Sequence, residues 1–468
     1  MTEKKTVQVL LLLLFAVMTT LSLFSEGSGY GGGDSNMHMF ISKFSFKHHE
    51  LFLHHWGKPF FILVSSPFAQ FGFLGMNIFN TICALSTAYL MYLLAKKFSF
   101  KNSWLVIFMS LFAPVYFVVI FSGLTEIFFG FILVFSIFLF VEKKYFLSSI
   151  TLSFLPFIRS EGYLLLPLFA FVLLYRKKIS AVPWLVTGTI VYSLIGLIYF
   201  HDFFWLAHQD PYTSGKNIYG NGSLFFFLSQ NEFIFGTALV VLILTGLISL
   251  FVKKKEEGIF FNEIRIEESL LLYGSFVIYF VAHSIFWWKG WFGSDGLIRV
   301  MAAVTPLLAL LALRGANAVL SVKNSVIIKA VFLILIIAIP FRQHTFPEHL
   351  DYEESTLHQA DTWIQRENLS SAKIFYAHPF VVYELNKDPF DKNSAVEFYA
   401  LNPETPEISV APGELVIWDS HFGPNEGRIP LQKLEGNKNF KMLNSFLSAI
   451  VVTPGNKERF RVVVFRRI

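Results

Sequence analysis

Two neighbouring stretches decide how this chain folds: VQVLLLLLFAVMTTLSLF at residues 7–24 and GYGGGDSNMHMFISKFSFKHH at residues 29–49. The first is an unbroken apolar run long enough for one membrane-spanning helix. The second begins with glycines, places the acid Asp34 just beyond the span, and continues with apolar residues at helical spacing. We expect Asn36–His49 to form an amphipathic helix lying flat on the bilayer, with Met37, Phe40, Ile41 and Phe44 on its apolar stripe.

Composition places the whole chain in the same class. Of its 468 residues 54% are hydrophobic and 15% are charged, and the mean hydropathy is +0.55. A soluble domain carries about 25% charged residues. The lone cysteine, Cys83, excludes an intrachain disulfide and a cysteine-based zinc site. The net charge of +5 comes from short basic clusters between apolar runs, which indicates membrane orientation and not nucleic-acid binding.

The apolar runs predict eleven membrane spans in a mainly α, polytopic domain over residues 1–341. They cover residues 7–24, 71–95, 104–121, 126–141, 147–158, 162–175, 181–200, 232–252, 268–288, 298–313 and 325–341. The fifth is short and contains Pro156, so it could be a half-helix or re-entrant segment. The first could instead be a signal peptide, but it lacks a clear Ala-x-Ala cleavage site, which favours an uncleaved helix.

The basic clusters orient these spans. In an eleven-span count all of them fall on one side, which the positive-inside rule assigns to the cytoplasm. The clusters are Lys4-Lys5, Lys96-Lys97 with Lys101, Lys143-Lys144, Arg176-Lys177-Lys178, Lys253-Lys254-Lys255, and Arg314 with Lys323. We therefore expect a multi-pass protein of a bacterial inner or plasma membrane, with a cytoplasmic N-terminus, a first outer loop at 25–70 and an extracytoplasmic C-terminal region.

The composition changes from apolar to polar in residues 342–468. They are polar and contain β-like runs at 373–377, 414–418 and 461–465, with an amphipathic helix expected near Ser355–Glu367. We predict a small extracytoplasmic α/β domain, in which we find no nucleotide-binding glycine motif.

Ionisable residues gather on the predicted outer side, where the charge rule expects few cations. Ionisable groups at membrane depth are costly and by default mark a functional site. Each also has a plainer explanation: Glu126 could cap a helix, Arg159 and Glu161 could pair with each other, Arg299 could reach the headgroups, and the histidine pairs at 48–49 and 54–55 fit a solvated surface better than a metal site. The candidates are Asp34, His38, Trp56, Lys58, Glu126, Arg159, Glu161, Asp210, Tyr212, Lys216 and Arg299.

Five segments follow one another in the first 340 residues: Gly-Gly-Asp34-Ser-Asn-Met-His, Trp56-Gly-Lys-Pro59, Gly123-Leu-Thr-Glu126, Arg159-Ser-Glu-Gly162, and Ile298-Arg299 followed by Pro306. On these segments, residues 1–340 resemble the GT-C superfamily of integral-membrane glycosyltransferases, which includes protein and lipid mannosyltransferases and lipid A aminoarabinose transferases. The chain departs from the family in having a lone first-loop Asp where members have an adjacent acidic pair, and its tail matches no acceptor domain.

The resemblance implies an inverting transfer of a mannose-like hexose from a polyprenyl-phosphate donor to a lipid, glycan or protein acceptor on the outer face. Asp34 would be the base, while Arg299, Arg159 and Lys216 would bind the donor phosphate. Glu126, Glu161, Asp210, Tyr212, His38, Trp56 and Lys58 would bind substrate or support the site. No cofactor is implied, and a divalent metal is possible but not required.

Two other functions remain open at this point. A transporter or lipid flippase would place polar groups near mid-membrane and often shows repeats, whereas the polar residues here gather at one face and no repeat is evident. His283 is the main exception, and a histidine satisfied within the core explains it better. A non-catalytic scaffold would not explain carboxylates and arginines at four separate outer turns.

Overall fold

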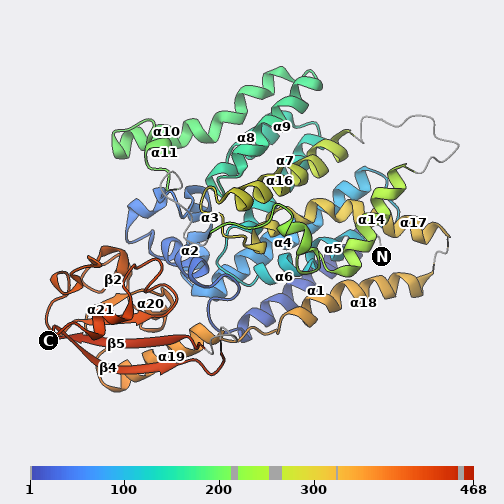
Figure 1. The fold of residues 1–468 in the computed structure, drawn as a ribbon. Coiled ribbons are helices and arrows are strands. Elements are labelled where there is room, and N and C mark those ends of the chain that lie inside the picture. Colours follow the sequence, from blue (N-terminus) through green and yellow to red (C-terminus); the bar gives the residue numbers. More distant parts are fainter. Residues whose placement is uncertain (1–2, 212–219, 252–265, 323–324, 452–457) are drawn as a thin grey trace.

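The computed structural model describes residues 3–211, 220–251, 266–322, 325–451 and 458–468. A helical bundle occupies most of the chain, and a small sheet with its own helices lies at one end of that bundle (Figure 1). This agrees with the predicted combination of a mainly α part followed by a C-terminal α/β part.

Five helical stretches among the described residues are long and apolar enough to cross a membrane. They are α1 (Glu3–Phe24), α4 (Gly72–Lys97), η3 with α10 (Ile179–Val186 and Thr187–Phe200), η4 with α16 (Glu267–Gly274 and Ser275–Lys289) and α18 (Val326–Gln343). At 1.5 Å per residue, 20 residues span the roughly 30 Å of a bilayer core. These helices indicate an integral membrane protein.

The remaining apolar runs form shorter or broken helices. The run at 104–121 is divided at Pro114, the run at 147–158 ends in a 3₁₀ turn containing Pro156, and η4 is a π-helix. Proline breaks a helix because it lacks an amide hydrogen and clashes with the preceding turn. The elements are α5 (Leu105–Leu111), α6 (Pro114–Val119), α7 (Glu126–Val141), α8 (Tyr145–Ser153), η2 (Leu155–Phe157), α9 (Gly162–Tyr175), α11 (Trp205–His208), α12 (Phe226–Ser229), α13 (Asn231–Ile234), α14 (Thr237–Phe251), η5 (Ile298–Ala303), η6 (Thr305–Leu308) and α17 (Ala309–Val322). The number of spans and their orientation stay predictions.

The segment after α1 folds into α2 (Gly32–Phe44), η1 (His49–Leu53) and α3 (Pro59–Ala69). The expected amphipathic helix is therefore present, but it begins at Gly32 and not at Asn36. Its stripe residues Phe40 and Ile41 are buried inside the protein and not spread on a bilayer surface. The reason is that α3 and a helix of the C-terminal part pack against α2.

The C-terminal part contains a five-stranded mixed sheet in the order β2-β1-β3-β5-β4. Strand β1 (Ile374–Tyr376) is parallel to β2 (Ala395–Glu397) and β3 (Leu415–Asp419), while β5 (Arg461–Arg467) is antiparallel to β3 and β4 (Phe440–Leu447). The three β-like runs correspond to β1, β3 and β5, and the expected helix is α19 (Tyr352–Arg366). Short elements complete the domain: α20 (Phe380–Glu384), η7 (Phe398–Ala400), η8 (Pro406–Ile408) and α21 (Leu431–Glu435).

The glycine-rich stretch joins the two parts. The amide and hydroxyl of Ser28 both donate to the carboxylate of Glu354 on α19. Gly29 forms a β-bridge with Ser122, with φ +66°, and a Cβ there would collide with the carbonyl oxygen of Phe121. Only glycine combines this positive φ with so close an approach of two backbones. The joint brings the start of α2 next to the C-terminal domain.

Candidate active site

A cavity of about 730 Å³ lies between the helical bundle and the C-terminal sheet domain. Its wall comes from the start of α2, the loop before α3, the turn before α7, the turn before α9, the end of α16, the loop leading into η5, and loops of the sheet domain. Segments far apart in the sequence therefore meet around one space. Nearly all of the sequence-derived candidates lie on this wall.

Asp34 and Arg299 are in direct contact on this wall. Arg299 Nη2 donates to Asp34 Oδ2, and Nη1 donates to the carbonyl oxygen of Gly31 at 3.1 Å. The Arg299 side chain is 11% exposed, whereas that of Asp34 is 45% exposed. Asp34 occupies the first turn of α2, where the helix dipole favours a negative charge. The pair thus presents an accessible carboxylate held in place by a mostly buried guanidinium.

Arg159 lies between two carboxylates. Its Nη1 is 2.7 Å from Glu126 Oε1 and its Nη2 is 2.8 Å from Glu161 Oε1. Nη1 also donates to the Thr125 hydroxyl at 3.2 Å. His283 Nε2 lies 3.0 Å from Glu161, so this histidine belongs to the site and is not simply satisfied within the core. Because two acids surround one guanidinium, the charge of Arg159 is already balanced.

Lys58 is a third cation on the wall, and it is only 5% exposed. Its Nζ donates to the Ser160 hydroxyl at 2.8 Å. Burial lowers the pKa of Lys58 to about 8, with Arg159 adding to the effect and Glu161 opposing it. The ammonium is therefore mostly charged at neutral pH and loses its proton in mildly alkaline solution.

His38 stacks on Trp56, with ring centroids 4.5 Å apart and planes 14° apart. Burial, assisted by the positive charge of Arg159, lowers the pKa of His38 well below its ordinary value, so the ring is neutral. Its Nδ1 is buried and has no hydrogen-bond partner within the part of the chain that the structure describes. The same holds for Oε2 of Glu126. Buried polar atoms are nearly always paired, so these two are candidates for contact with a ligand.

Asp210 also lines the cavity, whereas Tyr212 and Lys216 lie outside the described residues. Several residues of the cavity wall were not among the candidates predicted from the sequence. His54 is half-buried, with a pKa lowered to about 4 by burial and by neighbouring His55 and Lys58, so its assignment to a solvated surface is wrong. Asp295, an acid of the predicted outer loop that also carries Arg299, lines the cavity as well. The C-terminal domain contributes wall residues that were not among the candidates, namely Ala377, Pro379, Glu397, Tyr399, Phe422 and Glu426. No local pattern distinguishes these tail residues.

No group of three His, Cys, Asp or Glu side chains within residues 3–211, 220–251, 266–322, 325–451 and 458–468 has an arrangement suited to a metal ion. The possibility of a metal therefore finds no candidate ligand set in these ranges.

The fold is shared with solved membrane glycosyltransferases of the GT-C superfamily. ArnT from Cupriavidus metallidurans, in a crystal structure bound to undecaprenyl phosphate, superposes with a TM-score of 0.63 at 10% identity and 97% coverage of both chains. The mycobacterial arabinofuranosyltransferase AftD gives 0.52 at 10% identity, over 98% of this chain and 40% of its own. An oligosaccharyltransferase from Archaeoglobus fulgidus gives 0.51 at 12% identity, over 87% and 69%. No family model and no curated protein matches the sequence.

Proposed function

We propose that this chain, which has the GT-C fold, is an inverting glycosyltransferase that moves a hexose from a polyprenyl-phosphate donor to a hydroxyl acceptor. The observation that carries the proposal is the contact of Asp34 with Arg299 on the wall of a cavity that also holds Lys58. A carboxylate that can accept a proton and cations that can neutralise a phosphate are the two requirements of this reaction.

In the reaction, the acceptor oxygen forms a bond to the anomeric carbon while the bond from that carbon to the phosphate oxygen breaks. The electron pair leaves with the polyprenyl phosphate, and the acceptor proton passes to Asp34. Arg299 binds the departing phosphate, since a guanidinium has five N–H donors and only part of them contact Asp34 and Gly31. Lys58 adds a second positive charge.

Arg159 has a different role in this proposal. Its two carboxylates already balance its charge, so we assign it to holding Glu126 and Glu161 in position. Oε2 of Glu126, which has no hydrogen-bond partner among the described residues, and the neutral ring of His38 then orient the hydroxyls of the donor sugar. This replaces the phosphate-binding role that the sequence resemblance implied for Arg159.

The membrane placement belongs to the same proposal. The cavity is lined by residues of the bundle and of the C-terminal domain, which lies at one end of the bundle (Figure 1), and the basic clusters predict that this end faces away from the cytoplasm. A mannose-like sugar remains our expectation from the resemblance.

Transfer from defined polyprenyl-phosphate hexoses by the detergent-solubilised full chain tests the proposal. Asp34→Asn should lower the transfer rate by about 10²- to 10⁴-fold, the usual contribution of a general base. Glu50→Gln is the matched control, because Glu50 is an exposed acid of the same loop that does not line the cavity. Full activity of Asp34→Asn, with the variant folded as judged by its melting curve, would overturn the assignment of the base.

A further inference from the structure

The C-terminal domain forms one side of the proposed catalytic cavity. It contributes Glu397, Tyr399, Phe422 and Glu426 to the wall that Asp34 also lines. The domain is therefore part of the site and does not merely cover it. The chemistry of these side chains indicates what they could bind.

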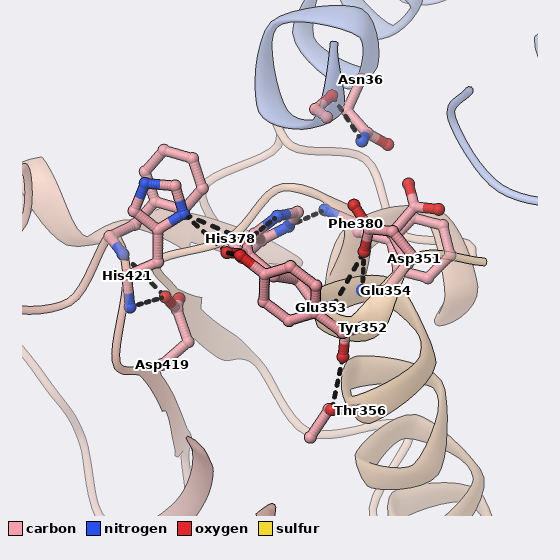
Figure 2. A network of polar contacts seen from close by, with 12 residues as sticks. Asn36, Asp351, Tyr352, Glu353, Glu354, Thr356, His378, Phe380, Asp419 and His421 are labelled. Atoms are coloured by element: carbon pink, nitrogen blue, oxygen red, sulfur yellow. Dashed lines mark hydrogen bonds and ion pairs between the residues drawn. The ribbon is translucent and has the colours of Figure 1, made fainter. Parts of the chain in front are cut away.

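The loop after β3 is held against the start of α2. Asp419 accepts hydrogen bonds from the amides of His421 and Phe422, at 2.9 and 2.7 Å. His421 stacks on Phe422 and donates to Glu353 on α19 at 3.0 Å (Figure 2). A Cβ on Gly33 would lie 2.9 Å from the ring of Phe422, so this ring packs directly beside the residue that precedes Asp34. These contacts thus fix the position of the loop after β3 relative to Asp34, the proposed base.

Tyr399 is 66% exposed, so its ring is accessible on the cavity wall. Its hydroxyl donates to Glu426, and Glu397 accepts from the Tyr376 hydroxyl at 3.2 Å. An accessible aromatic face with carboxylates around it suits a sugar ring, whose apolar face stacks on the aromatic and whose hydroxyls donate to the carboxylates.

The charges on the cavity wall indicate which charge the acceptor can carry. Among the described residues, seven acids and three Lys or Arg residues line the cavity. Arg159 is balanced by Glu126 and Glu161, and Arg299 contacts Asp34. Among the described residues that the C-terminal domain contributes to the wall, Glu397, Tyr399 and Glu426 have polar side chains, and none is a cation. A phosphorylated or otherwise anionic acceptor would meet repulsion on this side, whereas a neutral polyhydroxyl acceptor would not.

The cavity wall also contains buried polar atoms that can bind a ligand. Oε2 of Glu126, which is 2% exposed, and Nδ1 of His38, which is 8% exposed, have no hydrogen-bond partner in the portion of the chain described. They come from α2 and α7, whereas Glu397, Tyr399 and Glu426 come from the C-terminal domain. The cavity is thus lined by polar groups from both parts of the chain.

From these observations we infer that Tyr399, Glu397 and Glu426 form the acceptor subsite, and that the acceptor is a neutral carbohydrate. This inference rests on the proposed glycosyltransferase function. A ring of the acceptor stacks on Tyr399, and one of its hydroxyls reaches Asp34, to which it gives up its proton as the new glycosidic bond forms. The donor phosphate occupies the side of Arg299 and Lys58.

The test measures transfer by the full chain at saturating donor, with a neutral oligosaccharide, the same oligosaccharide carrying a phosphate, and a basic peptide as acceptors. Tyr399→Ala should raise the KM for the neutral acceptor at least tenfold and leave the donor KM within twofold. Tyr399→Phe keeps the aromatic face, so its acceptor KM should stay within about threefold of the unsubstituted protein. Glu426→Gln should raise the acceptor KM, and Glu367→Gln, an exposed acid that does not line the cavity, should not.

Saturation-transfer NMR of the neutral oligosaccharide with the detergent-solubilised protein gives a second readout that needs no turnover. Signals from the sugar ring should be present with the unsubstituted protein and lost with Tyr399→Ala. Preference for the phosphorylated acceptor or the peptide, or an unchanged acceptor KM in Tyr399→Ala, would overturn the inference while the proposed function stands. Absence of transfer to every acceptor would overturn both.

Discussion

The guanidinium of Arg299 contacts the carboxylate of Asp34 although the two residues are 265 positions apart in the chain. The same guanidinium binds the backbone of Gly31, so one side chain fixes both the loop and the first turn of α2. Gly31 has φ +111°, and a Cβ there would lie 3.0 Å from Arg299 Nη1, so the glycine makes room for this contact. The proposed base is therefore positioned by the residue that we assign to the leaving group.

Substitutions of Arg299 should distinguish the effect of its positive charge from the effect of its forked donor geometry. We expect Arg299→Gln to lower kcat/KM for the donor about 100-fold or more, because it removes both the phosphate cation and the partner of Asp34. Arg299→Lys keeps the charge but loses the forked donor geometry, so its loss should be smaller but still large. Steady-state kinetics with a polyprenyl-phosphate sugar measures both. Equal activity of all three proteins would remove Arg299 from the mechanism.

The titration of Lys58 should weaken donor binding at alkaline pH. The pKa of its ammonium is about 8, so the charge that binds the donor phosphate is present below that pH and lost above it. The donor KM should therefore rise from about pH 8 upward, and Lys58→Met should show a high KM with no such dependence. Lys101→Met, at an exposed turn away from the cavity, is the matched control.

The effect of Lys58 on stability has the opposite sign. Its folded pKa lies below the unfolded value of about 10.5, so between about pH 8 and 10.5 the unfolded chain binds the extra proton. The contribution of Lys58 to the free energy of unfolding consequently increases with pH in that range. Melting curves at several pH values should show this increase, and Lys58→Met should abolish it. A fall in both donor affinity and stability above pH 8 that persists in Lys58→Met would contradict the assignment.

The contacts of Arg159 with Glu126 and Glu161 should contribute more to folding stability than to binding of the donor phosphate. Arg159→Met leaves Glu126 and Glu161 buried without their cation, which costs roughly 3–5 kcal/mol of folding free energy. Combining it with Glu126→Gln should restore part of this loss. Arg342→Met provides the control, because Arg342 and Glu232 form an exposed pair whose loss costs about 1 kcal/mol or less. Melting of the detergent-solubilised variants measures the difference, and equal effects at the two sites would refute the prediction.

The loop after β3, which carries Phe422, should be less stable at low pH and at high pH than between them. Burial alone would raise the pKa of Glu353, but hydrogen bonds from His378 and His421 outweigh it and lower the pKa to about 2. Its contribution is thus present above about pH 4.5 and lost as pH falls toward 2. The hydrogen bond to Glu353 raises the pKa of His421, so that contribution is complete below about pH 6.5 and lost as pH rises through the raised value.

Hydrogen exchange over residues 419–427, corrected for the intrinsic pH dependence of exchange, measures this stability. Protection should be greatest between the two limits and should fall in Glu353→Gln across that whole range. The acceptor KM should rise in the same variant, because Phe422 and Glu426 are then less firmly positioned. Unchanged protection in Glu353→Gln would show that other contacts hold the loop.

The sequence alone determined the class of this protein, because hydrophobicity and its spacing are local properties. The long apolar runs predict helices such as α4 and α18, the polar tail predicts the sheet domain, and the glycine-rich loop draws attention to Asp34. Five of the expected spans correspond to long helices, while proline divides others, as at Pro114. Local pattern also indicated most of the charged residues of the cavity, because each lies in a predicted outer loop or turn between apolar runs.

Only the tertiary structure decided which of those charges are partners. Arg159 and Arg299 are alike in sequence context, yet one lies between two glutamates and the other contacts Asp34. Likewise, Tyr399 and Glu426 reach the cavity because Glu354 binds Ser28 and Phe422 packs on Gly33. Ion pairs and domain contacts of this kind join residues hundreds of positions apart, and their energies depend on burial and distance, which no local pattern of residues encodes.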